Sequence, residues 1–240
     1  MERVITYDDL RNFAYANDRI CQQPIKRIVL SFFGLNMSNM FNEDIPEGIF
    51  YAEQGILYVV PYTNPWAWMN RQAVKYTDEI IDVLIDQYKL PDNTPIVSTG
   101  GSMGGLSAIV YTRYAKRTPV ACVANCPVCD LVFHYGERPD LPRTLYSAFY
   151  DYDGDIKGAM KTASPLHLVP EMPKAGYHIF HCDQDTAVNI DAHSKKFVTA
   201  MKEREYNITF DIVPGRDHCD LTEEMRHLFM EYCVNAVEKK

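Results

Sequence analysis

The sequence predicts an α/β fold in which helices cover both faces of a mostly parallel sheet. Short apolar segments such as 25–33 and 120–125 have the length and composition of buried strands. Between them lies a segment with helical spacing, residues 71–88, whose apolar side chains recur every three or four positions opposite a charged face. Strands that alternate with helices form parallel crossovers, and a sheet built in this way needs helices on both sides.

The other expected elements follow from the same patterns of hydrophobicity. Pro91 ends the long helix, and a helix running to about residue 116 follows the glycine-rich turn at 100–105. Residues 4–7 and 12–16 are expected to be edge strands, with helix as the alternative. The remaining predictions are strands at 55–62, 95–99, 176–182 and 207–213, and helices at 191–204 and 221–237.

Length and charge restrict the classes of function. The 240 residues suit one large domain, so we expect a single domain over residues 1–240. With 24 basic and 32 acidic residues the net charge is −8, which disfavours binding to nucleic acid or to anionic membranes. Neither a signal-peptide run nor a stretch of transmembrane length is found, so a cytoplasmic protein is expected.

The cysteines indicate reduced thiols. Their number, seven, is odd, and a chain of this size needs no disulfide framework. Cys126 and Cys129 form a Cys-x-x-Cys motif, which can be a redox pair or half of a zinc site. The motif follows a strand deep in the chain and no second copy completes a ligand set, so packing is the favoured role. We therefore predict no metal and no cofactor.

The motif with the most chemical content is Gly100-Gly101-Ser102-Met103-Gly104, between a predicted strand and a predicted helix. It fits Gly-x-Ser-x-Gly, the nucleophile elbow, in which a serine occupies a strained turn from strand to helix. Random placement of the chain's glycines and serines would produce this pattern only about 0.02 times. The spacing excludes dinucleotide and phosphate loops, which leaves a glycine-rich structural turn as the alternative to a nucleophilic Ser102.

The partners that a nucleophilic serine needs also follow in a suitable order. The hydroxyl requires a base to take its proton and an acid to orient that base. In enzymes built on parallel sheets these groups follow strands at the carboxyl edge, in the order serine, acid, histidine. Asp183 and Asp185 follow the strand at 176–182, and His218 lies between the last strand and the last helix. We therefore predict His218 as the base, with a pKa near the ordinary value of about 6.5.

Three later motifs extend the pattern. They are Ser164-Pro165, His181-Cys182-Asp183-Gln184-Asp185-Thr186-Ala187-Val188 and Pro214-Gly215-Arg216-Asp217-His218. Together with the elbow they resemble the prolyl-oligopeptidase-like α/β-hydrolases. By this resemblance Asp185 is the triad acid and His218 the base, while His181 falls on a structural histidine. The chain departs from the family pattern where Cys182 and Cys219 replace glycines and where Phe33-Gly34 replaces His-Gly.

The resemblance implies an α/β-hydrolase fold and acyl transfer through Ser102. His218 would take the serine proton, and Asp185 would orient the imidazole and stabilise its charged form. The backbone N–H groups of Met103 and Leu35 are the expected oxyanion donors.

The same resemblance permits both peptidases and carboxylesterases. Its large oligopeptidases carry an additional N-terminal domain, for which this length leaves no room. We therefore expect a hydrolase that acts on a small-molecule carboxylic ester. A small peptidase or aminoacyl-amide hydrolase is the alternative within the family, and an inert binding protein is the alternative from another class.

Aromatic residues supply the candidate substrate pocket, which includes Trp66, Trp68, Phe133, Tyr146 and Phe149. For several of them a place in the core is an equally good interpretation. Residues 128–168, which contain three of these aromatics, lack a clear periodicity. We expect this segment to form a small cap over the pocket, with a peripheral helical insertion as the alternative.

Overall fold

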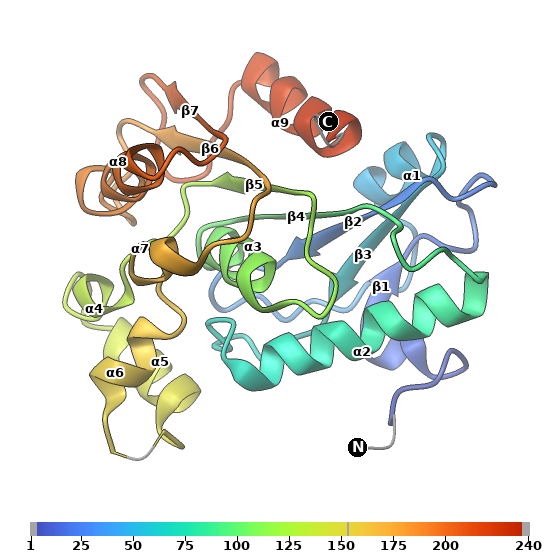
Figure 1. Cartoon of the computed structure of the whole chain (residues 1–240), viewed down its shortest axis with the longest axis horizontal. Coiled ribbons are helices and arrows are strands. Elements are labelled where there is room, and N and C mark those ends of the chain that lie inside the picture. The colour runs from blue at the N-terminus through green and yellow to red at the C-terminus, as the bar shows by residue number, and fades with distance from the viewer. Residues whose placement is uncertain (1–3, 153, 237–240) are drawn as a thin grey trace.

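A seven-stranded sheet forms the centre of the computed structural model, which describes residues 4–152 and 154–236 (Figure 1). The strand order is β1-β3-β2-β4-β5-β6-β7; β1 is antiparallel to β3, and the other neighbouring pairs are parallel. The strands are β1 (Ala14–Ala16), β2 (Arg27–Phe32), β3 (Ile56–Pro61), β4 (Ile96–Gly101), β5 (Ala121–Asn125), β6 (Gly176–Cys182) and β7 (Ile208–Val213). The predicted mostly parallel α/β fold is confirmed.

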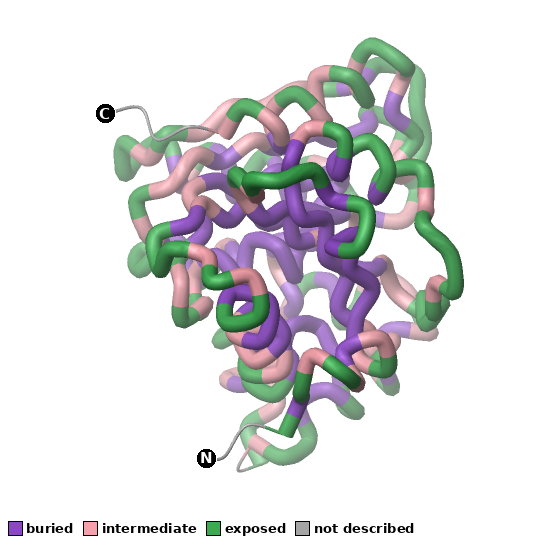
Figure 2. Tube along the Cα trace, turned by 90° about the vertical axis from the view of Figure 1, so that its right-hand side faces the viewer, coloured by how far each residue is buried: buried purple, intermediate pink, exposed green. Residues whose placement is uncertain are grey.

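Helices pack on both faces of this sheet. Side chains alternate along each strand, so that in β2 Ile28 and Leu30 face one core and Val29 faces the other. The first core is covered by α2 (Arg71–Tyr88), α3 (Met103–Tyr114) and α8 (Lys196–Glu203), and the second by α1 (Pro46–Ala52) and α9 (Glu223–Asn235). Figure 2 shows buried residues running through the middle of the molecule. None of the described helices is long and apolar enough to cross a bilayer.

Helix α2 has the bounds that its spacing predicts. At its start the side chain of Asn70 accepts a hydrogen bond from the N–H of Ala73 at 3.0 Å, which satisfies one of the free donors of the first turn. At its end Lys89 takes a left-handed conformation with φ 50°, a common way for a helix to terminate.

The N-terminal segment differs from the prediction. Only Ala14–Ala16 joins the sheet, whereas residues 4–7 form no strand. The N–H groups of Val4 and Ile5 instead donate to Glu79 Oε1 at 2.5 and 2.6 Å, so this segment is attached to α2 rather than to a sheet edge. At the other terminus α9 ends at Asn235, and the predicted helix end at Val237 lies outside the described residues.

The described part of residues 128–168 contains four short helices. They are α4 (Leu131–His134), α5 (Leu141–Phe149), α6 (Ile156–Lys161) and α7 (Pro165–Leu168). Helix α5 is attached to the loop before α2, because Trp68 Nε1 donates to Thr144 Oγ1 at 3.1 Å and Asn70 Nδ2 donates to the carbonyl of Ala148 at 3.0 Å. A role as a cap over bound substrate stays a prediction.

The turn between β4 and α3 depends on close backbone packing. A Cβ atom on Gly100 would lie 2.6 Å from the carbonyl oxygen of Gly104. A Cβ atom on Gly104 would collide with the carbonyl of Phe32 at the end of β2. Backbone atoms cannot move away from a clash as the end of a flexible side chain can. The close packing of α3 against the end of β2 therefore requires glycine at positions 100 and 104.

We therefore expect Gly104→Ala to lower the free energy of unfolding by about 1–3 kcal/mol or more, since overpacking of this kind forces the backbone to shift. Gly136→Ala is the matched control, because its nearest neighbour, the carbonyl oxygen of Phe133, would be 3.8 Å away. Urea unfolding followed by circular dichroism measures both. Equal stability of the two variants would contradict the packing argument.

Candidate active site

Ser102 occupies the apex of the turn between β4 and α3. Its backbone has φ 59° and ψ −123°, a conformation that costs energy in any residue with a side chain and that is found where the surroundings hold it in place. Here the N–H of Ser102 donates to the carbonyl of Asn125 at 2.9 Å, and its own carbonyl accepts from Leu106 at 3.1 Å. The predicted nucleophile elbow geometry is thus present.

Asp185 lies in the loop after β6 with a fully buried side chain. Its Oδ1 accepts hydrogen bonds from the N–H groups of Ala187 and Val188, both at 2.8 Å. Its Oδ2 lies 2.7 Å from His218 Nδ1. Asp183 contacts a different group, because its Oδ1 accepts from the N–H of Gly215 at 2.6 Å. Of the two carboxylates that follow β6, Asp185 is therefore the one that meets the imidazole.

His218 has a defined tautomer. A carboxylate only accepts hydrogen bonds at neutral pH, so Nδ1 carries a proton and donates it to Asp185, and in the neutral form of the imidazole the lone pair lies on Nε2. Ser102 and His218 line the same pocket. The described contacts include no hydrogen bond between the Ser102 hydroxyl and His218 Nε2; in ligand-free sites such bonds are often long and shorten when substrate binds.

A second aspartate fastens the two loops to each other. Asp217 Oδ1 accepts from the N–H of Thr186 at 2.9 Å, from the Thr186 hydroxyl at 3.0 Å and from the N–H of His218 at 2.7 Å. The carboxylate next to the base thus binds the loop that carries the acid. Sequence order alone does not separate this role from that of a surface residue.

His181 supports the acid from inside β6. Its Nε2–H donates to the carbonyl of Val188 at 3.1 Å and lies 3.3 Å from Asp185 Oδ2, while Nδ1 accepts from the Ser194 hydroxyl at 2.6 Å. The side chain is fully buried. The contacts fit the structural role that the family resemblance implies.

A cluster of Glu137, His134 and His193 connects the 128–168 segment to the loop after β6, which carries Asp185. Glu137 Oε2 lies 2.5 Å from His134 Nδ1 and 2.7 Å from His193 Nε2, and its Oε1 accepts from the N–H of Asn189 at 3.4 Å. Burial alone would raise the pKa of Glu137, but hydrogen bonds from both histidines lower it to about 2. An ionised Glu137 therefore ties α4 to the end of the acid loop.

Electrostatics separate the acid from the base. Burial alone would raise the pKa of Asp185, yet hydrogen bonds from His181, His218 and the Val188 N–H hold it well below its usual range. Burial would lower the pKa of His218, but hydrogen bonding to Asp185 and Cys126 and the charge of Asp185 raise it to about 9. The ordinary value expected from the sequence is therefore corrected upward.

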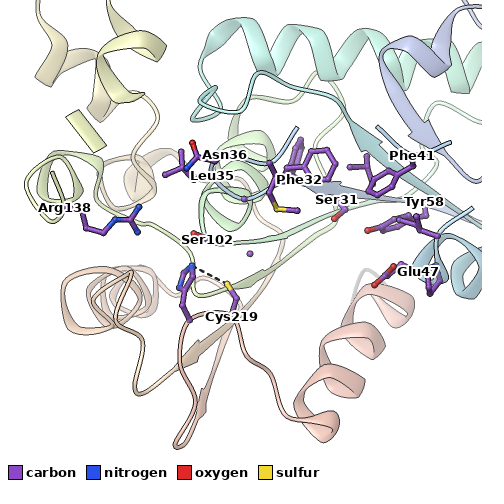
Figure 3. A pocket seen from close by; sticks show the side chains of 18 residues that line it. Ser31, Phe32, Leu35, Asn36, Phe41, Glu47, Tyr58, Ser102, Arg138 and Cys219 are labelled. Carbon is purple, nitrogen blue, oxygen red and sulfur yellow. Dashed lines mark hydrogen bonds between the residues drawn. The ribbon is translucent and has the colours of Figure 1, made fainter. Parts of the chain in front are cut away.

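The pocket in front of Ser102 has a volume of about 670 Å³. Its apolar wall comes mainly from residues after β2 and from β3, including Phe33, Phe41 and Tyr58. Figure 3 shows charged side chains at opposite ends, with Arg138 on one side and Glu47 of α1 on the other. Arg138 is the described residue of the 128–168 segment that reaches this pocket.

Two backbone N–H groups are free to bind an oxyanion. Leu35 lines the pocket, and Met103 begins α3, where the first N–H groups have no partner within the helix. Neither N–H donates to another described residue. Met103 directly follows Ser102 at the positive end of the α3 dipole, and Leu35 shares the pocket with Ser102. Their role as oxyanion donors stays a prediction.

The aromatic residues predicted to bind substrate are not gathered at this pocket. Trp68 and Phe149 are each 1 % exposed and belong to the core, so their predicted role is corrected. Trp66 lines a separate hollow of about 240 Å³, and its Nε1 donates to Asn36 at 2.7 Å. Phe133 and Tyr146 are exposed on the surface and do not line the main pocket.

The structure brings to the site cysteines to which the sequence interpretation gave no functional role. Cys219 lines the pocket, and its Sγ lies 3.7 Å from His218 Nε2, the contact dashed in Figure 3. Cys126 is buried behind it and accepts the N–H groups of Cys182 and Cys219, both at 3.4 Å. Cys129 is buried separately, with its Sγ 3.5 Å from the carbonyl of Pro127. The available signal was the presence of cysteine where the family pattern has glycine.

The raised pKa of His218 predicts an alkaline dependence of turnover. If His218 is the base it must be neutral, so kcat/KM should increase about tenfold per pH unit below the pKa and level off above about 9. The measurement is kcat/KM between pH 6 and pH 10 for a small chromogenic substrate. A plateau already reached near pH 7 would contradict the coupling of His218 to Asp185.

Comparisons with known proteins support the fold and identify the family. A model of the prolyl oligopeptidase family matches residues 67–231. The Pyrococcus horikoshii acylaminoacyl peptidase superposes with a TM-score of 0.71 at 15% identity, covering 91% of this chain and 38% of that chain. A puromycin hydrolase gives 0.71 at 13% identity, covering 88% and 33%. A Mycobacterium tuberculosis puromycin-hydrolysing peptidase gives 0.67 at 15% identity, covering 82% and 32%.

These likenesses establish the fold, and the chain spans about a third of the length of each compared structure. No curated protein matches the sequence. The family model, in contrast, covers well over half of the residues and includes the elbow, the acid loop and the base loop. The chain therefore belongs to the prolyl oligopeptidase family.

Proposed function

We propose that the protein is a serine hydrolase that cleaves short peptides or aminoacyl amides through an acyl-enzyme on Ser102. The main observation in support of the proposal is that the loops bearing Ser102, Asp185 and His218 lie close together. Ser102 and His218 line one pocket, and Asp185 holds the imidazole with its Nε2 lone pair available. A hydroxyl, a base and an orienting acid are the groups that acyl transfer to serine requires.

The proposed reaction begins when Ser102 Oγ attacks the substrate carbonyl carbon. His218 Nε2 takes the hydroxyl proton, and Nδ1–H keeps its hydrogen bond to Asp185, which stabilises the imidazolium. The oxyanion accepts hydrogen bonds from the N–H groups of Met103 and Leu35. His218 then protonates the leaving amine, and a water molecule, deprotonated by His218, releases the acid.

Peptide and amide substrates are favoured over esters by two observations. The family is named for an oligopeptidase, and two of the compared structures are described as peptidases. The pocket carries Arg138 and Glu47 at opposite ends of an apolar wall, an arrangement that suits a substrate with polar or charged ends. Small carboxylic esters, the expectation from the sequence, are the second candidate because the same acyl-enzyme chemistry cleaves them.

The alternative of an inert binding protein requires that the serine and histidine loops stay apart. They lie instead at one pocket, and the acid loop contacts the base loop through both Asp185 and Asp217. This convergence supports an enzyme.

Ser102→Ala should reduce hydrolysis by about 10⁶-fold, to the background of the assay, because the nucleophile is removed. It should also abolish labelling by a fluorophosphonate, measured by mass spectrometry of the intact protein. Ser147→Ala, in an exposed position on α5, is the control and should be labelled as the wild type is. Full labelling of Ser102→Ala would refute the assignment.

Replacement of the two carboxylates after β6 should affect kcat very differently. Asp185→Asn should lower kcat by about 10⁴-fold, since an amide cannot hold the imidazole in the same tautomer. Asp183→Asn removes a carboxylate from the same loop that contacts Gly215 instead, and its kcat should change far less. The comparison uses the same substrate and folded protein, checked by circular dichroism; the reverse order would move the acid to Asp183.

A substrate panel separates the two candidates. We expect measurable kcat/KM on aminoacyl and peptidyl arylamides, in addition to cleavage of short-chain nitrophenyl esters. Hydrolysis of the esters alone would favour the carboxylesterase. Loss of both activities in Ser102→Ala shows that each belongs to this site.

A further inference from the structure

Two thiols and the imidazole of His218 meet beside the proposed nucleophile. Cys126 Sγ, Cys219 Sγ and a ring nitrogen of His218 all lie within 4.8 Å of one another. Two cysteines and one histidine are a ligand set suited to Zn²⁺ and to other soft divalent cations. We propose that these three residues form a Zn²⁺ site and that the bound cation switches the hydrolase off.

The spacing of the three ligand atoms suits a tetrahedral cation. With Zn–S bonds of about 2.3 Å and a Zn–N bond of about 2.0 Å, neighbouring ligand atoms are about 3.5–3.8 Å apart. His218 Nε2 and Cys219 Sγ are already 3.7 Å apart. Cys126 Sγ lies within 4.8 Å of Cys219 Sγ and of a ring nitrogen of His218, so its distance to Cys219 Sγ exceeds the tetrahedral spacing by at most about 1 Å.

The tautomer of His218 presents the correct atom. Its Nδ1–H is held by Asp185 at 2.7 Å, which leaves the Nε2 lone pair on the side of Cys219. Metal-binding histidines in proteins commonly donate their other ring N–H to a carboxylate, which fixes the ring and increases its basicity. Asp185 would serve this purpose for the cation as it does for the serine.

In a second cluster of similar spacing, no such histidine lone pair faces the other ligand atoms. His134, Glu137 and His193 also bring ligand atoms within 4.8 Å of one another. However, His193 Nδ1 accepts the backbone N–H groups of Cys129 and Asp130, both at 3.1 Å, so its Nε2 carries a proton that it donates to Glu137. A cation there would have to reverse this tautomer against two N–H donors. A third group within 4.8 Å, Cys126 with His181 and Asp185, offers only one thiol, and both ring nitrogens of His181 already have hydrogen-bond partners in Ser194 and Val188. The site is therefore assigned to Cys126, His218 and Cys219.

The neighbouring Cys219 thiol and burial raise the pKa of Cys126, so a bound cation has to displace the proton of this thiol. Cys126 Sγ accepts two backbone N–H groups, which would stabilise a thiolate. Binding forms two metal–sulfur bonds and one metal–nitrogen bond. The two thiols release their protons to solvent, and below a pH of about 9 the charged imidazole of His218 also releases its Nε2 proton. Two thiolates balance the charge of the cation, His218 keeps its Nδ1 proton, and water from the pocket takes the fourth position.

Cys219 occupies a backbone position that would favour glycine. Its φ is 59°, in the left-handed region where glycine is preferred. Its Sγ also approaches Gly101, where a Cβ atom would lie only 3.1 Å away. Glycine at position 219 would remove both constraints. Cys219→Gly therefore deletes the ligand while relieving the backbone, and Cys219→Ser is a second variant that keeps the side-chain size.

The functional consequence rests on the proposed function, whereas cation binding itself does not. A cation bound to Nε2 occupies the lone pair that would accept the proton of Ser102. The base is then lost without unfolding of the protein, and a chelator that removes the cation restores it.

The binding experiment uses Co²⁺ as a spectroscopic probe of chelator-treated protein kept reduced with a phosphine. Wild type and Ser102→Ala should both bind one Co²⁺ per chain, with a thiolate-to-cobalt charge-transfer band and intense visible bands that Zn²⁺ removes. Cys219→Gly and Cys219→Ser should lose the charge-transfer band. Cys21→Ala, which alters a buried thiol on another part of the chain, should keep it. A spectrum without thiolate ligation in the wild type, or one unchanged in both Cys219 variants, overturns the site.

The inhibition experiment titrates buffered free Zn²⁺ against hydrolysis, with each variant compared to its own activity without metal. The wild type should be inhibited and then restored by a chelator, and both Cys219 variants should need at least about tenfold more Zn²⁺. Equal inhibition of the wild type and these variants overturns the proposal. Cobalt binding in a protein that hydrolyses no substrate supports the site and refutes the proposed function; hydrolysis without cobalt binding does the reverse.

Discussion

The carboxylate of Asp185 joins parts of the molecule that lie far apart in the sequence. One oxygen accepts two N–H groups of its own loop, and the other meets His218, thirty-three residues later in the chain. His181, buried in β6, approaches the same oxygen. A buried charge is tolerated only when it is paired and hydrogen-bonded, and these contacts meet that condition. The tautomer of His218 and the direction of its lone pair follow from this carboxylate, which together with Cys126 also raises the pKa of the imidazole.

The sheet provides the frame that brings these loops together. Because β2, β4, β5, β6 and β7 are parallel, their carboxyl ends lie at one edge, and the elbow, acid and base loops each follow one of them. Close packing of α3 against β2 at Gly104 then holds the turn that carries Ser102 at the same edge. The rigid core determines where the reactive groups lie, and the short loops determine how they point.

Much of this arrangement can be predicted from the sequence. Strand ends and chain order locate Ser102 and His218 and leave Asp183 and Asp185 as candidates for the acid, and the family resemblance selects Asp185. Other features depend on tertiary contacts that leave no periodic signal. Trp68 and Phe149 resemble pocket residues by type, but long-range packing buries them. Arg138 lies in a segment without periodicity, and only the folded chain shows that it reaches the pocket. The pKa of His218 depends on the balance between burial and a buried charge, which composition does not contain.

The contact between Glu137 and Asn189 has a consequence for how the domain can be modified. Loops and insertions are usually the parts of a fold that can be exchanged to alter specificity. Here the helical segment that carries Arg138 to the pocket also holds, through Glu137, the loop that bears the acid. One piece of chain therefore carries both a residue of the pocket wall and the contact that holds the acid loop. A graft that replaced this segment to obtain a new pocket wall would have to retain the His134–Glu137–His193 cluster as its anchor.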